Sequence, residues 1–180
     1  MDERSRQPPT QKPAVKAGPR TYRRWVVNLA VIAMLFFALR ECNRQNLASG
    51  TAPPFEARSI DGRSVSLEQL RGEPLLLHFW ASWCGVCSAM AGNIEAVARD
   101  YRVLTVASQS GEAQEVQAYV SEHGLSFPVL VDADGRLARR YGVHAFPTTF
   151  LIDKKAVIRY AEVGFTTEIG LRIRAYLSRH

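Results

Sequence analysis

Two cysteines in the stretch HFWASWCGVCSAM, residues 78–90, have the spacing in this chain that most directly suggests chemistry. Cys84 and Cys87 form a C-x-x-C pair that follows Trp80 and Trp83. A pair with this spacing can be a structural disulfide, half of a metal site or a redox-active dithiol. Which of these it is depends on the elements that the rest of the chain places around it.

The three alternatives are not equally compatible with the other residues. A tetrahedral zinc site needs a second pair of ligands, but the remaining cysteine is Cys42 and the four histidines are scattered. A structural bridge between Cys84 and Cys87 would close too small a loop to stabilise a fold much. A copper site that adds His144 to the two cysteines stays open as an alternative. The sequence therefore favours a redox-active dithiol, with no metal and no cofactor.

Alternating strand and helix patterns surround the cysteines. Continuous apolar runs predict buried strands, and a composition or periodicity typical of helices separates them. The order strand, helix, strand, helix, strand predicts a parallel sheet with right-handed crossovers, followed by an antiparallel hairpin and a closing helix. The expected strands are 74–82, 102–108, 127–132, 148–153 and 156–164, and the expected helices are 84–99, 111–124 and 167–177. Asp61-Gly62 predicts the turn of a smaller hairpin before them.

This order of elements places Cys84 at the end of a buried strand and at the start of a helix. A thiolate there is stabilised by unpaired backbone N–H groups and by the positive end of the helix dipole. Cys87 follows about one turn later, so the spacing suits a dithiol in which Cys84 attacks a partner disulfide and Cys87 resolves the mixed disulfide. Gly85 and Val86 keep the turn between them unobstructed, and Trp83 is expected to flank the exposed sulfur.

The N-terminal part has a different composition. Residues 1–24 hold seven Lys or Arg and two acidic residues, which leaves 16 basic and 15 acidic residues in the remainder. The net charge of +6 therefore lies in the tail, and a nucleic-acid partner is not expected. The tail has almost no large apolar residues, which predicts disorder.

An uncharged, mostly apolar run over residues 25–39 follows the basic tail. We interpret residues 25–42 as a retained transmembrane signal anchor, because Trp25 suits the membrane interface and Arg40 can extend the span by snorkelling. The basic flank predicts that the tail stays in the cytoplasm and that the C-terminal part crosses the membrane. Residues 43–51 are expected to be a linker and 52–180 the main domain, while lipidation of Cys42 is not expected because Arg40 and Glu41 precede it.

From about Ala52 to its end the chain resembles the thioredoxin superfamily. The paired motifs FWASWCGVC, residues 79–87, and YGVHAFPTTFLID, residues 141–153, carry the resemblance. The chain is similar to the membrane-anchored, extracytoplasmic proteins of the TlpA, ResA and CcmG type, and most of all to the ScsD-like proteins linked to copper tolerance. The resemblance implies an α/β thioredoxin-like fold, a central mixed sheet flanked by helices. It also implies that Pro147 is cis beside the dithiol and that the backbone of Phe146 pairs with the substrate chain.

Two acidic residues of the family pattern are absent. His78 stands six residues before Cys84, where cytoplasmic thioredoxins have a buried aspartate, and no glutamate follows Cys87 closely. His78 could carry a proton in place of the aspartate, because imidazole titrates near neutral pH. A histidine on a buried strand is more often a hydrogen-bonded core residue, and His144 is likewise expected to be structural. The missing acids make specialised reduction of apocytochrome c less expected.

These observations predict a protein disulfide oxidoreductase held by one helix at a bacterial inner membrane, with its thioredoxin-like domain in the periplasm. Its expected partners are protein thiols and disulfides and a membrane-embedded electron donor or acceptor. The expected catalytic residues are Cys84, Cys87 and Pro147, and the expected substrate-binding residues are Trp83, Gly85, Val86 and Phe146. The alternatives are a copper-binding chaperone that uses the same cysteines, an apocytochrome c thiol reductase and, less expected, a peroxidase.

Overall fold

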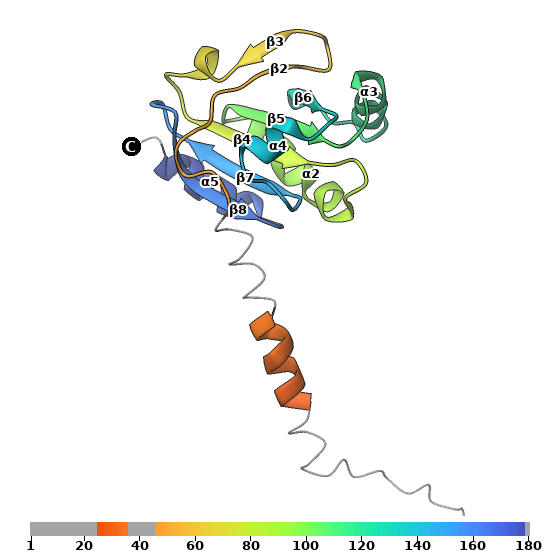
Figure 1. The fold of residues 1–180 in the computed structure, drawn as a ribbon, viewed down its shortest axis with the longest axis vertical. Coiled ribbons are helices and arrows are strands. Elements are labelled where there is room, and N and C mark those ends of the chain that lie inside the picture. Colours follow the sequence, from red (N-terminus) through yellow and green to blue (C-terminus); the bar gives the residue numbers. More distant parts are fainter. Residues whose placement is uncertain (1–24, 36–45, 179–180) are drawn as a thin grey trace, which may run out of the picture. The chain divides into compact units, whose positions relative to one another are not determined.

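The computed structural model describes residues 25–35 and 46–178 (Figure 1). Residues 25–35 form a helix whose side chains are exposed, and residues 46–178 belong to a separate compact unit. Among the described residues, no helix has both the length and the apolar character that spanning a membrane requires. The predicted tail, residues 1–24, and the parts of the predicted anchor and linker that fall in residues 36–45 lie outside the described residues.

Within residues 46–178, six strands form one mixed sheet in the order β1-β8-β7-β4-β5-β6. The neighbours β4, β5 and β6 run parallel, whereas β7 is antiparallel to β4, β8 to β7 and β1 to β8. The predicted alternation and the mixed sheet are therefore confirmed. The sheet strands are β1 Gly50–Thr51, β4 Leu75–Trp80, β5 Val103–Ser108, β6 Val129–Asp132, β7 Thr148–Ile152 and β8 Val157–Val163.

Within residues 46–178, three helices agree with the prediction and a fourth is additional. Helices α2, α3 and α5 occur where the sequence predicts helices, and α4 was not predicted. Their bounds are α2 Gly85–Ala98, α3 Ala113–Glu122, α4 Arg136–Arg140 and α5 Glu168–Leu177, with a short 3-10 helix at Glu68–Leu70. The side chains of Glu112 and Thr167 accept backbone N–H groups at the starts of α3 and α5, which fixes where these two helices begin.

The predicted hairpin is present as the strands β2, Glu56–Arg58, and β3, Ser64–Ser66. Gly62 has a φ of +82°, which a glycine adopts without steric cost, so the predicted turn residue is at its expected place. A bridge between Ser59 and Leu130 ties the hairpin to the outer strand β6. The hairpin is drawn in yellow tones at the top of Figure 1.

Part of the segment predicted to be a linker is packed against the domain. Leu47 is buried, the Ala48 N–H donates to the Tyr141 carbonyl at 3.0 Å, and Gly50 and Thr51 form β1. The compact fold therefore reaches further toward the N-terminus than residue 52.

The core of the described domain lies on both faces of the sheet because side chains alternate along each strand. On β4, Leu77 and Phe79 face a cluster with the hairpin, α4 and Tyr141. Leu76 and Trp80 face the opposite cluster, which includes side chains of α2, α3 and α5. All six residues of β4 are buried, so this strand forms the rigid base from which the cysteine loop emerges.

Candidate active site

The two predicted redox cysteines are joined by a disulfide at the start of α2. Cys84 is the residue before the helix, with its backbone in an extended conformation, and Cys87 lies in the first turn with a Cα–Cα distance of 5.2 Å. The backbone N–H of Cys87 points at Cys84 Sγ at 3.2 Å. An N–H directed at this sulfur, together with the helix dipole, would stabilise a Cys84 thiolate after the disulfide is reduced.

The loop before β7 lies against Cys84. The Phe146–Pro147 peptide bond is cis, as the resemblance implies, and the Phe146 carbonyl oxygen is 3.7 Å from Cys84 Sγ. Trp83 meets the ring of Phe146 edge to face, with 5.8 Å between the ring centres. The fold thus brings together the two predicted motifs, which are about sixty residues apart in the chain.

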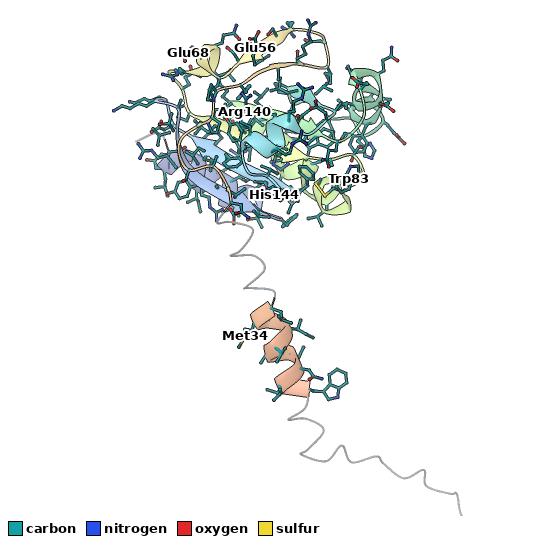
Figure 2. The ribbon with its side chains drawn as sticks, viewed as in Figure 1. Met34, Glu56, Glu68, Trp83, Arg140 and His144 are labelled. Atoms are coloured by element: carbon teal, nitrogen blue, oxygen red, sulfur yellow. A yellow bond between two sulfur atoms is a disulfide. The ribbon has the colours of Figure 1, made fainter. Side chains whose placement is uncertain are left out.

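An exposed apolar rim surrounds the disulfide. Trp83 is 64% exposed and Val86 is 49% exposed, whereas Cys84 and Cys87 are buried. Figure 2 labels Trp83 at the α2 end of the domain. Large apolar side chains are normally buried, so their exposure beside the disulfide makes this rim a candidate surface for a partner.

Phe165 is a further member of this rim that the sequence did not indicate. It is 51% exposed and follows Gly164, whose N–H donates to the Pro147 carbonyl at 2.8 Å. The next residue, Thr166, accepts a hydrogen bond from Asn93 of α2. The end of β8 is therefore fixed next to the cis-proline loop, and the exposed Phe165 follows it directly.

A second loop, after β5, holds the cysteine loop in place. The indole N–H of Trp83 donates to the Gln109 carbonyl at 2.9 Å, and the backbone N–H of Ser82 donates to Ser110 Oγ at 3.0 Å. The Ser110 hydroxyl in turn donates to the Ser108 carbonyl. Gln109 adopts a positive φ of 52°, an uncommon conformation for a residue other than glycine, which turns its carbonyl toward Trp83.

Buried hydrogen bonds continue from this loop to α4. The Ser108 hydroxyl donates to Asp132 at 2.9 Å, and the carboxylate also accepts the backbone N–H groups of Leu137 and Ala138. The buried Asp132 carboxylate thus satisfies the second and third N–H groups of a short helix that has little periodicity of its own, while the first N–H donates to Asp134. Ser110 and Asp132 support the site without touching the sulfurs, and neither residue type nor spacing marked them in the sequence.

His78 is buried below the site as a neutral side chain. It is 2% exposed, its Nδ1 lies 2.8 Å from Thr149 Oγ1, and burial lowers its pKa from 6.5 to about 3. His78 lies on the same face of β4 as Leu76 and Trp80, which is the face that α2 covers. These contacts are those of a hydrogen-bonded core histidine, and the proton-carrier role of His78 stays a hypothesis.

The similarity to known proteins agrees with this geometry. A family model described as the AhpC/TSA family matches residues 49–161, more than half of the chain. The chain belongs to the AhpC/TSA family. It is 30% identical over 166 residues to the thiol-disulfide oxidoreductase ResA of Geobacillus thermodenitrificans, an alignment that covers 88% of this chain and 95% of ResA.

Two solved structures share the fold. The pneumococcal exposed lipoprotein thioredoxin Etrx1 of Streptococcus pneumoniae is 33% identical with a TM-score of 0.60, over 69% of this chain and 98% of Etrx1. StoA of Bacillus subtilis is 27% identical with a TM-score of 0.60, over 68% of this chain and 97% of StoA. This AhpC/TSA chain is therefore a thioredoxin-like oxidoreductase, and its predicted resemblance to ResA-type proteins is confirmed. The likeness to ScsD-like proteins stays a prediction.

The described residues of this AhpC/TSA chain do not form a copper site with three or more grouped ligands. Among residues 25–35 and 46–178, no three or more His, Cys, Asp or Glu side chains are grouped so that they could hold a metal ion. Cys84 and Cys87 are joined to each other, and His144 is exposed (Figure 2). Cys42, the remaining cysteine, lies outside the described residues.

Proposed function

We propose that the chain is a protein thiol:disulfide oxidoreductase that is tethered by residues 25–42 and exchanges disulfides through its C-G-V-C dithiol. The disulfide between Cys84 and Cys87 at the first turn of α2, beside the Phe146 carbonyl, carries this proposal. A disulfide in this position is reversible because its reduced form is stabilised by the helix N-terminus. The exposed apolar rim gives a partner protein a surface on which to align its own disulfide.

In the reductive direction, the Cys84 thiolate attacks one sulfur of the partner's disulfide. A mixed disulfide forms between Cys84 and that sulfur, and the partner's second sulfur leaves as a thiolate. The Cys87 thiolate then attacks Cys84 Sγ, which releases the first partner sulfur as a thiolate and forms the disulfide seen here. Two electrons pass from the dithiol to the partner, and solvent protons convert the released thiolates to thiols. The oxidative direction is the reverse of these steps.

The partner chain is expected to bind across the cis-proline loop. We assign Pro147 to positioning that chain, and Phe146 to binding it through its backbone beside Cys84. Gly85 leaves the approach to Cys84 open, since it has no side chain and a Cβ placed there would face open space. Trp83 and Val86 supply exposed apolar area to the same partner. An extended segment bound by its backbone is a common mode of peptide recognition.

The proposed tether is supported by the apolar run over residues 25–39. Residues 25–35 of this run form an exposed apolar helix. The basic residues before the run favour a cytoplasmic tail and a domain on the periplasmic side of a bacterial inner membrane. Confinement to this surface raises the local concentration of a membrane-embedded electron donor or acceptor. Such a protein is therefore the expected redox partner that resets the dithiol.

Paired serine variants test the proposed roles. Cys87→Ser should accumulate a mixed disulfide with a substrate protein, because the resolving thiolate is missing, whereas Cys84→Ser should form none. The species are resolved by non-reducing electrophoresis after acid quenching and thiol alkylation. If Cys84→Ser exchanges disulfides at the native rate, the assignment of Cys84 as the attacking thiol is wrong. If Cys84→Ser traps the mixed disulfide and Cys87→Ser does not, the attacking and resolving roles are reversed.

The reduction potential of the Cys84–Cys87 pair determines whether the protein reduces or oxidises its partners. The oxidised chain is equilibrated in dithiothreitol or glutathione buffers, and the free thiols of Cys84 and Cys87 are counted by alkylation. A potential near the roughly −270 mV of thioredoxin indicates a reductant, and one near roughly −120 mV indicates an oxidant. If no reversible two-electron couple appears, the proposed exchange chemistry is wrong.

A further inference from the structure

Helix α5 presents an apolar face to solvent. Its buried residues, Leu171 and Ala175, pack on the side of the sheet that α2 covers. Ile169, Ile173 and Leu177 recur every four residues and are 71%, 55% and 52% exposed. Residues four apart lie on one side of a helix, so these three side chains form a continuous row, here called the α5 stripe.

Ion pairs hold the charged side chains of α5 away from this stripe. Arg172 lies 2.6 Å from Asp100 and 2.7 Å from Glu168, and Arg174 lies 3.1 Å from Glu162 of β8. Because these pairs join α5 to the end of α2 and to β8, they fix the orientation of the helix on the domain. The α5 stripe consequently points outward as a permanent feature of the fold.

The position of the α5 stripe relative to the incoming chain suggests what covers it. The chain joins the sheet through β1, which pairs with β8, the same strand that Arg174 ties to α5. Leu47 and Ala48 are already packed on the domain, so residues 40–45 connect it to the apolar run 25–39. Six residues span at most about 22 Å when fully extended. A bilayer that holds residues 25–39 is therefore within reach of the edge of the domain on which α5 lies.

We propose that the α5 stripe docks on the lipid surface of the membrane that holds residues 25–39, an inference that rests on the tether proposed above. A helix with aliphatic residues outward and arginines on its flanks has the character of helices that lie in the interface of a bilayer. Tyr176, 57% exposed on the same helix, is of a residue type enriched at that interface. The tether keeps the local lipid concentration high, which favours shallow insertion of these three side chains.

Docking would also determine where the dithiol meets its partners. Helix α2 packs against α5 and begins directly after Cys84. With the α5 stripe on the lipid, the Cys84–Cys87 disulfide is held at a fixed height above the membrane surface. Disulfides of membrane proteins at that height are then presented to the dithiol more often than those of proteins in the bulk.

Nitroxide labelling of the full chain in vesicles of phosphatidylethanolamine and phosphatidylglycerol tests this proposal. The protein is kept oxidised, so that Cys84 and Cys87 do not react, and carries Cys42→Ser. One variant bears the label at Ile173→Cys in the α5 stripe, and the matched control bears it at Gln114→Cys on the exposed side of α3. Collision with oxygen, which concentrates in lipid, is compared with collision with a water-soluble nickel complex.

We expect the oxygen-to-nickel collision ratio to be several-fold higher at position 173 than at position 114. Equal collision ratios at positions 173 and 114 would overturn the docking. If the same samples float with the vesicles, the chain is membrane-bound and the tether holds even though the docking is wrong. A chain that fails to float would overturn both the tether and the docking. Spin–spin broadening at position 173 that disappears on dilution with unlabelled chain would assign the stripe to a second copy of the chain and overturn lipid docking.

Discussion

The buried neutral His78 gives the stability of the domain a specific dependence on pH. Burial lowers the pKa of His78 to about 3 in the folded protein, whereas the unfolded imidazole titrates near its ordinary value of about 6.5. Between these two values the unfolded chain binds a proton that the folded chain does not. The His78 contribution to the free energy of unfolding is therefore complete above about pH 6.5 and is lost progressively as the pH falls toward about 3.

The size of the loss follows from the same two pKa values. Each pH unit inside this window corresponds to about 1.4 kcal/mol. From about pH 7.5 to about pH 4.5, His78 alone should lower the free energy of unfolding by roughly 2.7 kcal/mol. Carboxylates act at lower pH: burial raises the pKa of Asp153, but hydrogen bonds from Val157, Lys155 and Arg159 outweigh burial and lower it. The stability from Asp153 is therefore complete above about pH 4 and is lost below that.

Urea unfolding of the oxidised protein at several pH values in this range measures the effect. His78→Gln and His78→Leu should each reduce the loss of stability between about pH 7.5 and about pH 4.5, whatever their stability at neutral pH. The control is His144→Gln, which replaces an exposed histidine and should keep the wild-type slope. If both His78 variants lose as much stability as the wild type over this range, the reasoning about His78 is refuted.

Three further substitutions test the site and its support. Ser110→Ala removes the acceptor of the Ser82 N–H and should lower the free energy of unfolding by about 1–2 kcal/mol in urea titrations, while the exposed Ser121→Ala should change it by less than about 0.5 kcal/mol. Ile94→Ala removes most of a fully buried side chain of α2 and should lower the free energy of unfolding by about 2–5 kcal/mol, measured by urea and thermal unfolding. Phe165→Ser should lower kcat/KM for protein disulfides but leave the rate with a small aromatic disulfide unchanged, and equal effects on both would argue against a role in binding the partner protein.

Much of the fold follows from patterns that are local in the sequence. The strands β4, β5 and β6 were predictable because each is a continuous apolar run, and fully buried parallel strands need no alternation. The position of Cys84 follows from the switch between a buried strand and a helix. The pairing of Phe146 and Pro147 with the dithiol was implied by resemblance alone, because nothing local to either motif requires their proximity.

The remaining features depend on contacts between distant segments. Helix α4 has five residues and its first turn is fixed by Asp132. It is too short to show the periodic pattern from which a helix is predicted. The carbonyl of Gln109 holds Trp83 because of its backbone conformation, which its residue type does not predict. Phe165 becomes part of the rim only through the pairing of Gly164 with Pro147. Each of these contacts involves a backbone group of a distant residue, which leaves little signal in a single sequence.

The short strand β1 protects the outer edge of the sheet from other molecules. Gly50 and Thr51 pair with Ile158 and Val157, whose backbone groups would otherwise be free to accept a foreign strand. A shortened chain that begins at Ala52 would keep the redox cysteines and the whole rim around them, yet it would uncover this edge. We therefore expect this shortened chain to associate with itself through added strands more readily than the longer chain does.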